Sequence, residues 1–207
     1  MRGGREAVSP HGNARSVIYD TAGGCCKMAY YQIQKLAKNA SDTLRAQAGA
    51  VSVLAGEIWR ETYTPIIGAA QVDYMLEKFQ SAERIYADIS KNGYTYLTAT
   101  DIGKDRLIGY CAVVAQEDHL FLSKIYVHRD SRGTGVARSF LDEAQALCRL
   151  EYGFDKIRLT VNKQNENAIA VYGKVGFTVV DSVTTDIGGG FYMDDYVMEL
   201  TITHNNL

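Results

Sequence analysis

The chain has 207 residues, of which 46% are apolar and 22% are charged, and its formal net charge is −2. These values are typical of one globular domain, or of one domain with an appendage. So small a net charge argues against bulk attraction to nucleic acid or to an anionic membrane, and no apolar run approaches the length of a membrane span. The four cysteines, at positions 25, 26, 111 and 148, lack the spacing of a zinc site, so we expect no metal.

The N-terminal region, residues 1–27, combines glycine pairs with little hydrophobic periodicity. We interpret it as a flexible extension and place a single domain at residues 28–207. No apolar segment typical of a secretory signal precedes the first cysteine, so we expect a cytoplasmic protein with reduced thiols.

The domain begins with an alternating, strand-like run at residues 30–36. Ser41 is a candidate N-cap for a helix that reaches about Thr62, where a segment containing Pro65 and Gly68 is expected to break it. The remaining pattern predicts helices at 72–79 and 82–89, strands at 94–100, 106–114 and 119–127, a loop and helix at 132–151, a strand at 155–162, a helix at 165–175, and strands at 177–186 and 190–202. The order is therefore β-αα-ββ-β-α-β-α-ββ, an α/β chain of the α+β type with a mixed sheet flanked by helices.

A glycine-rich turn follows the strand at 119–127 and opens the next helix. Small residues let the backbone close around a ligand, and the first helical turn presents unpaired N–H groups to an anion. Arg132 and Arg138 bracket the turn and can add charge-assisted contacts to phosphate. The turn lacks the Gly-Lys-Ser/Thr ending of a Walker loop and the three glycines of a dinucleotide fingerprint. A tight loop without a ligand is the alternative.

A second motif favours a ligand. The strand at 155–162 is followed by the pattern Asn165-x-x-Ala168-x-x-x-Tyr172-x-x-x-Gly176-Phe177. Together with the Arg132-x-x-Gly135-x-Ala137 turn, this pattern resembles the GCN5-related N-acetyltransferase (GNAT) superfamily over roughly residues 28–203. The resemblance implies the GNAT fold, with a mostly antiparallel central sheet, and acetyl-CoA as the acetyl donor.

The resemblance also assigns roles. Tyr172 is the expected general acid, because a phenol is protonated at neutral pH and can hand its proton to a departing thiolate. The main chain at Ile125, Tyr126 and Val127 is expected to pair with the pantetheine arm where the strands at 119–127 and 155–162 splay apart. Asn165 is expected to contact the cofactor or to cap its helix, and Lys174 to reach the phosphates. The expected phosphate loop comprises Arg132, Gly133, Thr134, Gly135, Val136, Ala137 and Arg138.

The general base is open at this stage. Many GNAT enzymes carry a Glu in the strand before the loop, but here residues 121–124 contain no carboxylate. A water held by Ser123 is one option. Glu117, Asp118 and His119 are others, although they are more typical of a hairpin turn.

The acceptor pocket is expected between the first helices and the last hairpin, with Trp59, Tyr63, Ser123, Tyr192 and Asp194 as candidates for substrate binding. Asp194 and its neighbour Asp195 could attract a cationic amine, or they could be a solvated pair at a turn. The segments 57–63 and 191–194 resemble a bacterial polyamine acetyltransferase branch. We therefore expect an enzyme acting on a small primary amine, polyamine-like or amino-acid-like; a protein N-terminal or lysine acetyltransferase and a non-catalytic acyl-CoA sensor are the alternatives. A homodimer is a family-level expectation.

Overall fold

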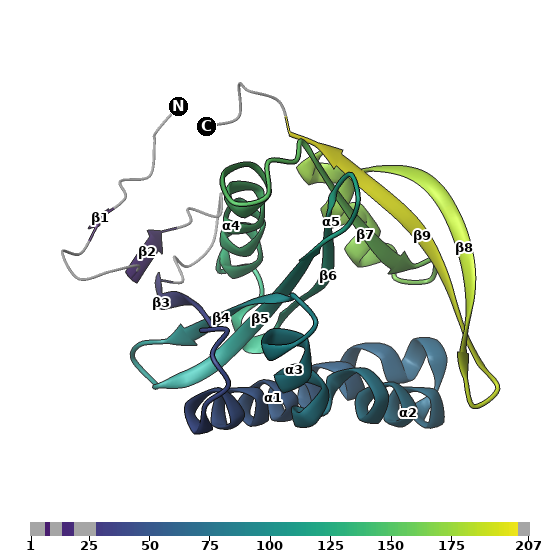
Figure 1. Ribbon diagram of the computed structural model, residues 1–207, viewed down its shortest axis with the longest axis horizontal. Coiled ribbons are helices and arrows are strands. Elements are labelled where there is room, and N and C mark those ends of the chain that lie inside the picture. Colours follow the sequence, from purple (N-terminus) through teal and green to yellow (C-terminus); the bar gives the residue numbers. More distant parts are fainter. Residues whose placement is uncertain (1–6, 9–13, 19–27, 203–207) are drawn as a thin grey trace.

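The computed structural model describes residues 7–8, 14–18 and 28–202. Its nine strands and six helices follow in chain order within these described ranges (Figure 1): β1 (Ala7–Val8), β2 (Ala14–Ile18), β3 (Met28–Lys35), α1 (Asp42–Ile67), α2 (Ala69–Gln80), α3 (Ala82–Ser90), β4 (Thr95–Asp101), β5 (Arg106–Ala115), β6 (Leu120–Val127), the 3-10 turn η1 (Arg129–Ser131), α4 (Val136–Leu150), β7 (Lys156–Asn162), α5 (Glu166–Val175), β8 (Thr178–Gly188) and β9 (Phe191–Thr201).

The strands form one mixed sheet in the order β1-β2-β3-β4-β5-β6-β7-β9-β8. Every neighbouring pair is antiparallel except β6 and β7, which run parallel. From β3 onward, the strands and helices follow the expected β-αα-ββ-β-α-β-α-ββ, except that the helical part before β4 consists of three α-helices, α1, α2 and α3. Strands β1 and β2 precede it and lie within the region interpreted as an extension, whose other residues are outside the described ranges. The domain boundary at residue 27 stays a prediction.

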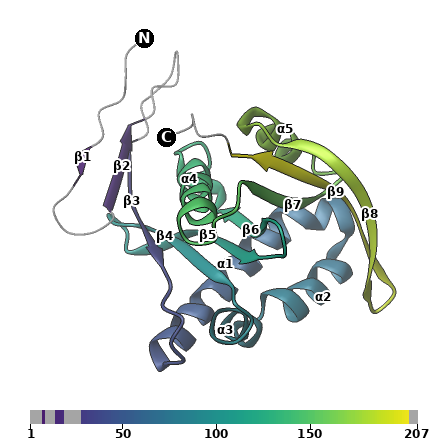
Figure 2. The ribbon, with the colours of Figure 1, turned by 45° about the horizontal axis from the view of Figure 1, so that its top comes forward.

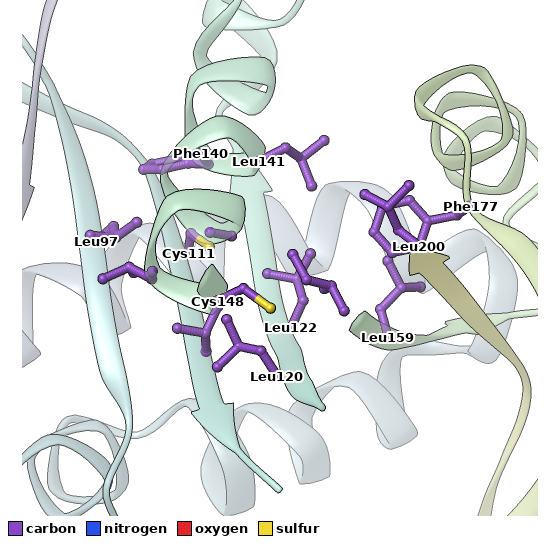
Figure 3. Close-up of a cluster of buried hydrophobic side chains, with 14 of the residues drawn as sticks. Leu97, Cys111, Leu120, Leu122, Phe140, Leu141, Cys148, Leu159, Phe177 and Leu200 are labelled. Atoms are coloured by element: carbon purple, nitrogen blue, oxygen red, sulfur yellow. The ribbon is translucent and has the colours of Figure 1, made fainter. Parts of the chain in front are cut away.

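Helices cover both faces of the sheet (Figures 1 and 2). Helices α1, α2 and α3 bury one apolar cluster against one face, and α4 and α5 pack on the other. Figure 3 shows the second cluster, in which Phe140, Leu141 and Cys148 of α4 lie over Cys111 and Leu122 of the central strands. Cys111 and Cys148 are buried free thiols, as their apolar surroundings predict.

Helix α1 is longer than expected. Ser41 caps it by accepting a hydrogen bond from the Leu44 amide at 3.1 Å. The predicted break at Pro65 is wrong, because α1 continues through the proline and ends at Gly68, whose φ is 80°. Tyr63 and Ile67 pack against the buried cluster of α1–α3. Their burial offsets the one backbone hydrogen bond that a proline removes.

Candidate active site

Strands β6 and β7 separate soon after they meet. Their parallel pairing is confined to Leu120 with Ile157 and Phe121 with Arg158. Beyond these two pairs each strand keeps only its other neighbour, β5 or β9. The remaining edge of β6 therefore carries backbone N–H and C=O groups that need partners. The sheet is open at this point, and side chains from its two faces can meet there.

A β-bulge in β6 decides which side chains face the opening. Ala112 pairs with Lys124 and the next residue, Val113, pairs with Leu122, so Ser123 is the extra residue. Leu122 therefore faces the α4 side, whereas Lys124 and Tyr126 face α1–α3. Ser123 itself is half-buried. Sequence alternation alone could not predict this change of face, because a bulge depends on the partner strand.

Lys124 lies in the segment 121–124, where many GNAT enzymes carry a Glu, and its side chain forms an ion pair with Asp88. It is 6% exposed, and its ammonium lies 3.6 Å from Oδ2 of Asp88 on α3. Burial lowers its pKa, and Asp88 opposes that shift. The alternative bases of the β5–β6 turn are also engaged: the Gln116 amide bonds the His119 carbonyl, and the Asp118 carboxylate lies 2.7 Å from His119 Nδ1. The predicted hairpin turn is confirmed there.

The glycine-rich turn adopts an anion-binding geometry. Gly133 and Gly135 have φ values of 77° and 88°, the left-handed region that suits glycine. Gly135 is the N-cap of α4 and has no side chain to cap it, so the first-turn amides of the helix are available to an anion. Thr134 donates to the Ser131 carbonyl at 2.6 Å and fixes the turn, and Val136 anchors α4 in the core.

Arg132 is held by α1. Its two terminal nitrogens each lie 3.3 Å from one carboxylate oxygen of Glu61, and its Nε donates to the Val127 carbonyl at 3.2 Å. The guanidinium remains 46% exposed. Arg138 pairs with Asp142 one turn later in α4, at 3.0 Å. Ala137 is half-buried behind it, and Lys174 is exposed in the last turn of α5.

Tyr172 and Asn165 lie on α5, on the α4 side of the sheet. Asn165 caps α5 by accepting from the Ala168 amide at 3.2 Å. Tyr172 packs against Phe177 with ring centroids 5.7 Å apart. Burial raises the pKa of Tyr172, and the neighbouring Tyr63 raises it further. Tyr172 and Tyr63 pack against the clusters on opposite faces of the sheet.

Four aromatic side chains form a cluster on the α1 side of the opening. The Trp59 ring centroid lies 4.7 Å from that of Tyr63 and 5.6 Å from that of Tyr126. Tyr110 extends the cluster, 5.2 Å from Tyr126. Burial raises the pKa of Tyr63, although the Tyr126 and Asn165 side chains act in the opposite direction. The expected residues Trp59, Tyr63 and Tyr126 are thus brought together beside the cap of α5.

The two aspartates of β9 are separated by the strand. Phe191, Met193 and Asp195 alternate onto one face, and the first two pack against the cluster of α1–α3. Tyr192 and Asp194 point to the other face: Tyr192 is 57% exposed, and Asp194 binds Lys163. The face toward the site therefore carries Asp195, which the alternation with two apolar residues could have indicated.

The last hairpin is fastened to α2. The Tyr74 hydroxyl and the Lys78 ammonium both donate to the Ile187 carbonyl, at 2.7 and 2.5 Å. The Gln71 amide donates to the Tyr192 carbonyl at 2.7 Å.

A groove of about 610 Å³ lies elsewhere, between α1 and α2, and includes Val53 and Leu76. That groove includes no residue of α5 or β9, which carry Tyr172 and Asp195. We therefore locate the candidate site by these side chains and not by the groove.

The sequence profile of the acetyltransferase (GNAT) family matches residues 56–177, more than half of the chain. The chain belongs to the GNAT family. This GNAT protein is therefore an acyltransferase, and acetyl-CoA is its acetyl donor. No curated protein matches it significantly in sequence.

Solved structures share the GNAT fold over most of the chain. The PaiA N-acetyltransferase from Thermoplasma acidophilum, in complex with coenzyme A, is 22% identical with a TM-score of 0.67, covering 83% of this chain and 98% of that one. A GCN5-related N-acetyltransferase from Rhodopseudomonas palustris is 16% identical with a TM-score of 0.68, covering 86% and 100%. A chimeric spermidine N-acetyltransferase from Vibrio cholerae is 19% identical with a TM-score of 0.56, covering 83% and 95%. At these identities the likeness establishes the fold.

Within the described ranges, no helix is long and apolar enough to span a membrane.

Proposed function

We propose that this GNAT enzyme transfers the acetyl group of acetyl-CoA to the primary amine of a small molecule, polyamine-like or amino-acid-like, by direct attack in a ternary complex. The observation that carries the proposal is the aromatic cluster of Trp59, Tyr63 and Tyr126 with the buried Asp195 on the same side of the sheet. Aromatic faces and a carboxylate attract an ammonium group. A protein acceptor would instead favour an open polar groove.

The phosphate loop is the proposed site for the cofactor's pyrophosphate. The uncapped N-terminus of α4 and the left-handed Gly133 and Gly135 suit an anion. Arg132 and Arg138 add charge at the two ends of the loop, Thr134, Val136 and Ala137 hold its backbone, and Lys174 is a further candidate for the phosphates. The free edge of β6 at Ile125, Tyr126 and Val127 offers backbone partners to the amides of the pantetheine arm, and Asn165 lies at the start of α5 beside it.

Tyr172 is the proposed general acid. Burial raises its pKa, so the phenol stays protonated throughout the neutral range. When the amine forms its bond to the acetyl carbon, the C–S bond breaks and the thiolate needs a proton. Tyr172 supplies it and regains one from solvent.

Two alternatives are set against this proposal. Acetylation of a protein N-terminus or a lysine predicts higher activity on peptides than on free amines. An acyl-CoA sensor predicts binding without turnover, and the presence of Tyr172 argues against it. Because one protein of this fold is a spermidine N-acetyltransferase, polyamines are the first amines to assay.

The test is a CoA-release assay on spermidine, amino acids, aminoglycosides and short peptides, beside calorimetry with acetyl-CoA. Turnover on a free amine, lost in Tyr172→Phe while acetyl-CoA affinity is kept, supports the proposal. Binding of acetyl-CoA without turnover on any acceptor overturns it.

The assembly proposed with this function is a cytoplasmic homodimer, without nucleic acid or membrane as a partner. Val179 and Val180 leave about half of their surface exposed on the edge strand β8, at 50% and 51%. An edge of this kind suits pairing with a second copy. Light scattering coupled to gel filtration tests the assembly.

A further inference from the structure

Asp195 is a buried carboxylate, and one of its two oxygens has no hydrogen-bond partner among the described residues. The residue is 3% exposed, and its Oδ1 atom accepts no hydrogen bond within the described part of the chain. It lies opposite Asn162 of β7 and Val183 of β8. Burying a carboxylate is unfavourable unless a donor or a cation meets it. An unpartnered, buried carboxylate oxygen beside the last residue of β7 therefore indicates that the missing partner is a ligand.

The surroundings of Asp195 suit one class of ligand. The negative charge of Asp195 helps to raise the pKa of Tyr63, and the Tyr63 ring packs against Trp59 in a tilted arrangement with centroids 4.7 Å apart. Electron-rich ring faces beside a carboxylate attract an alkylammonium group and leave little to bind an anion. The Tyr126 ring closes the same cluster at 5.6 Å from Trp59.

We propose that the Asp195 carboxylate receives the ammonium group of the acceptor and takes a proton from it, acting as the general base. This inference rests on the proposed function and adds the residue that the sequence left unassigned. In the step, one N–H proton of the ammonium passes to Asp195 and leaves a neutral amine. The amine forms the C–N bond, the C–S bond breaks, and the thiolate takes a proton from Tyr172. The nitrogen releases its second proton to solvent, Tyr172 regains a proton from solvent, and Asp195 returns its own to solvent.

The charges around Asp195 fit this role. The pKa of Asp195 is raised from the ordinary 3.8 to about 6: burial contributes most to the rise, Asp194 on the same strand adds to it, and Lys163 after β7 opposes it. Tyr63 on α1 faces it as a neutral phenol, since burial raises the Tyr63 pKa. A carboxylate in this range is ionised at neutral pH and is a better proton acceptor than an ordinary aspartate.

Asp194 provides a matched control. It neighbours Asp195 in sequence, but its carboxylate is 55% exposed and already binds Lys163. We expect Asp195→Asn to lower kcat/KM for the amine by roughly 100-fold or more, the usual contribution of a general base. Asp194→Asn should stay within about threefold of the wild type, as is usual for an exposed ion pair. Acetyl-CoA affinity, measured by calorimetry, should be unchanged in both.

Two readouts separate a base from a structural residue. The wild type should show kcat/KM rising through about pH 6. Asp194→Asn should show the same limb at a lower pH, because Asp194 raises the pKa of Asp195, and Asp195→Asn should lose the limb. Spermidine should also raise the melting temperature of the wild type and Asp194→Asn but not that of Asp195→Asn. If Asp195→Asn does not fold, the wild-type binding of spermidine must weaken as the pH falls through 6.

The failures are distinguishable. Equal kcat/KM and equal pH profiles in the two Asn variants, with an active wild type, overturn the role of Asp195 and leave the proposed function intact. An inactive wild type whose spermidine binding still requires Asp195 overturns the proposed function and the proton transfer, and leaves the ammonium site alone.

Discussion

Asp194 and Asp195 are adjacent in sequence and opposite in environment. Lys163 and Thr184 donate hydrogen bonds to Asp194, and both lower its pKa, with Lys163 the larger influence. Asp195, 3% exposed and without a partner for Oδ1, has its pKa raised to about 6. The environments of these two carboxyl groups shift their pKa values in opposite directions. The group whose pKa is raised, Asp195, is the candidate for a chemical role.

Asp195 should destabilise the free enzyme at neutral pH. Its pKa is higher in the folded state than the ordinary 3.8, so the folded state binds the proton more tightly. The stabilisation of the folded state by this tighter proton binding is complete below pH 3.8 and is lost as the pH rises through 6. At about 1.4 kcal/mol per pH unit, the difference between 3.8 and about 6 is on the order of 3 kcal/mol.

Asp195→Asn should therefore raise the free energy of unfolding at pH 8 relative to the wild type, and the increment should shrink as the pH is lowered through 6 toward 3.8. Urea unfolding at several pH values measures it. An increment that does not vary with pH would show that the carboxylate is not penalised in the folded state.

Tyr172→Phe should remove turnover without removing the fold. The ring that packs against Phe177 is kept and only the hydroxyl is lost. We expect kcat to fall by about 100-fold or more, as for the loss of a general acid. Stopped-flow measurement of CoA release gives kcat, and calorimetry gives the acetyl-CoA affinity, which should be unchanged. Undiminished kcat would remove Tyr172 from the chemistry.

Glu61 competes with phosphate for Arg132. The carboxylate holds both terminal nitrogens of the guanidinium at 3.3 Å, and the pair is partly exposed. Exposed pairs are worth about 0.2–1 kcal/mol, so Glu61→Gln should tighten acetyl-CoA binding by at most about fivefold. Arg132→Ala should weaken it. Weaker binding in Glu61→Gln would mean that Glu61 orients the arginine for the cofactor.

Gly109 permits the close approach of β5 to β6 beside the site. A Cβ there would lie 2.9 Å from the Tyr126 carbonyl oxygen and 3.1 Å from a ring carbon of Phe140. Because a backbone atom cannot turn aside, Gly109→Ala should cost about 1–3 kcal/mol of stability. It should also lower kcat/KM by displacing Tyr126. Gly49→Ala, where a Cβ meets nothing within 4 Å, is the control and should not destabilise. Unfolding of both variants in urea decides the point.

Hydrophobic periodicity and caps were sufficient for the element order from β3 onward. The period of α4 placed Val136 and Phe140 in the core, and they are 1% and 0% exposed. The expectation that the helix breaks at Pro65 was wrong, because the local rule for proline takes no account of the burial of Tyr63 and Ile67 on either side of it.

The site was harder to predict because the register of β6 depends on its pairing with β5 and not on its own sequence alone. The bulge at Ser123 sends Lys124 and Tyr126 to the α1 side, and it follows from pairing with Ala112 and Val113 rather than from residues 120–127 alone. Tyr172 and Asn165 were predicted from the resemblance of their motif to that of GNAT enzymes. The distinction between Asp194 and Asp195 required the strand alternation to be tied to Phe191 and Met193.

The acceptor class is tested most directly by one competition. The wild-type enzyme is incubated with acetyl-CoA and equimolar spermidine, amino acids and short peptides, and mass spectrometry follows the acetylated products alongside CoA release. We expect a free primary amine to be acetylated first, with one CoA released for each amide formed. Faster acetylation of a peptide N-terminus or lysine than of every small amine would contradict the proposed function.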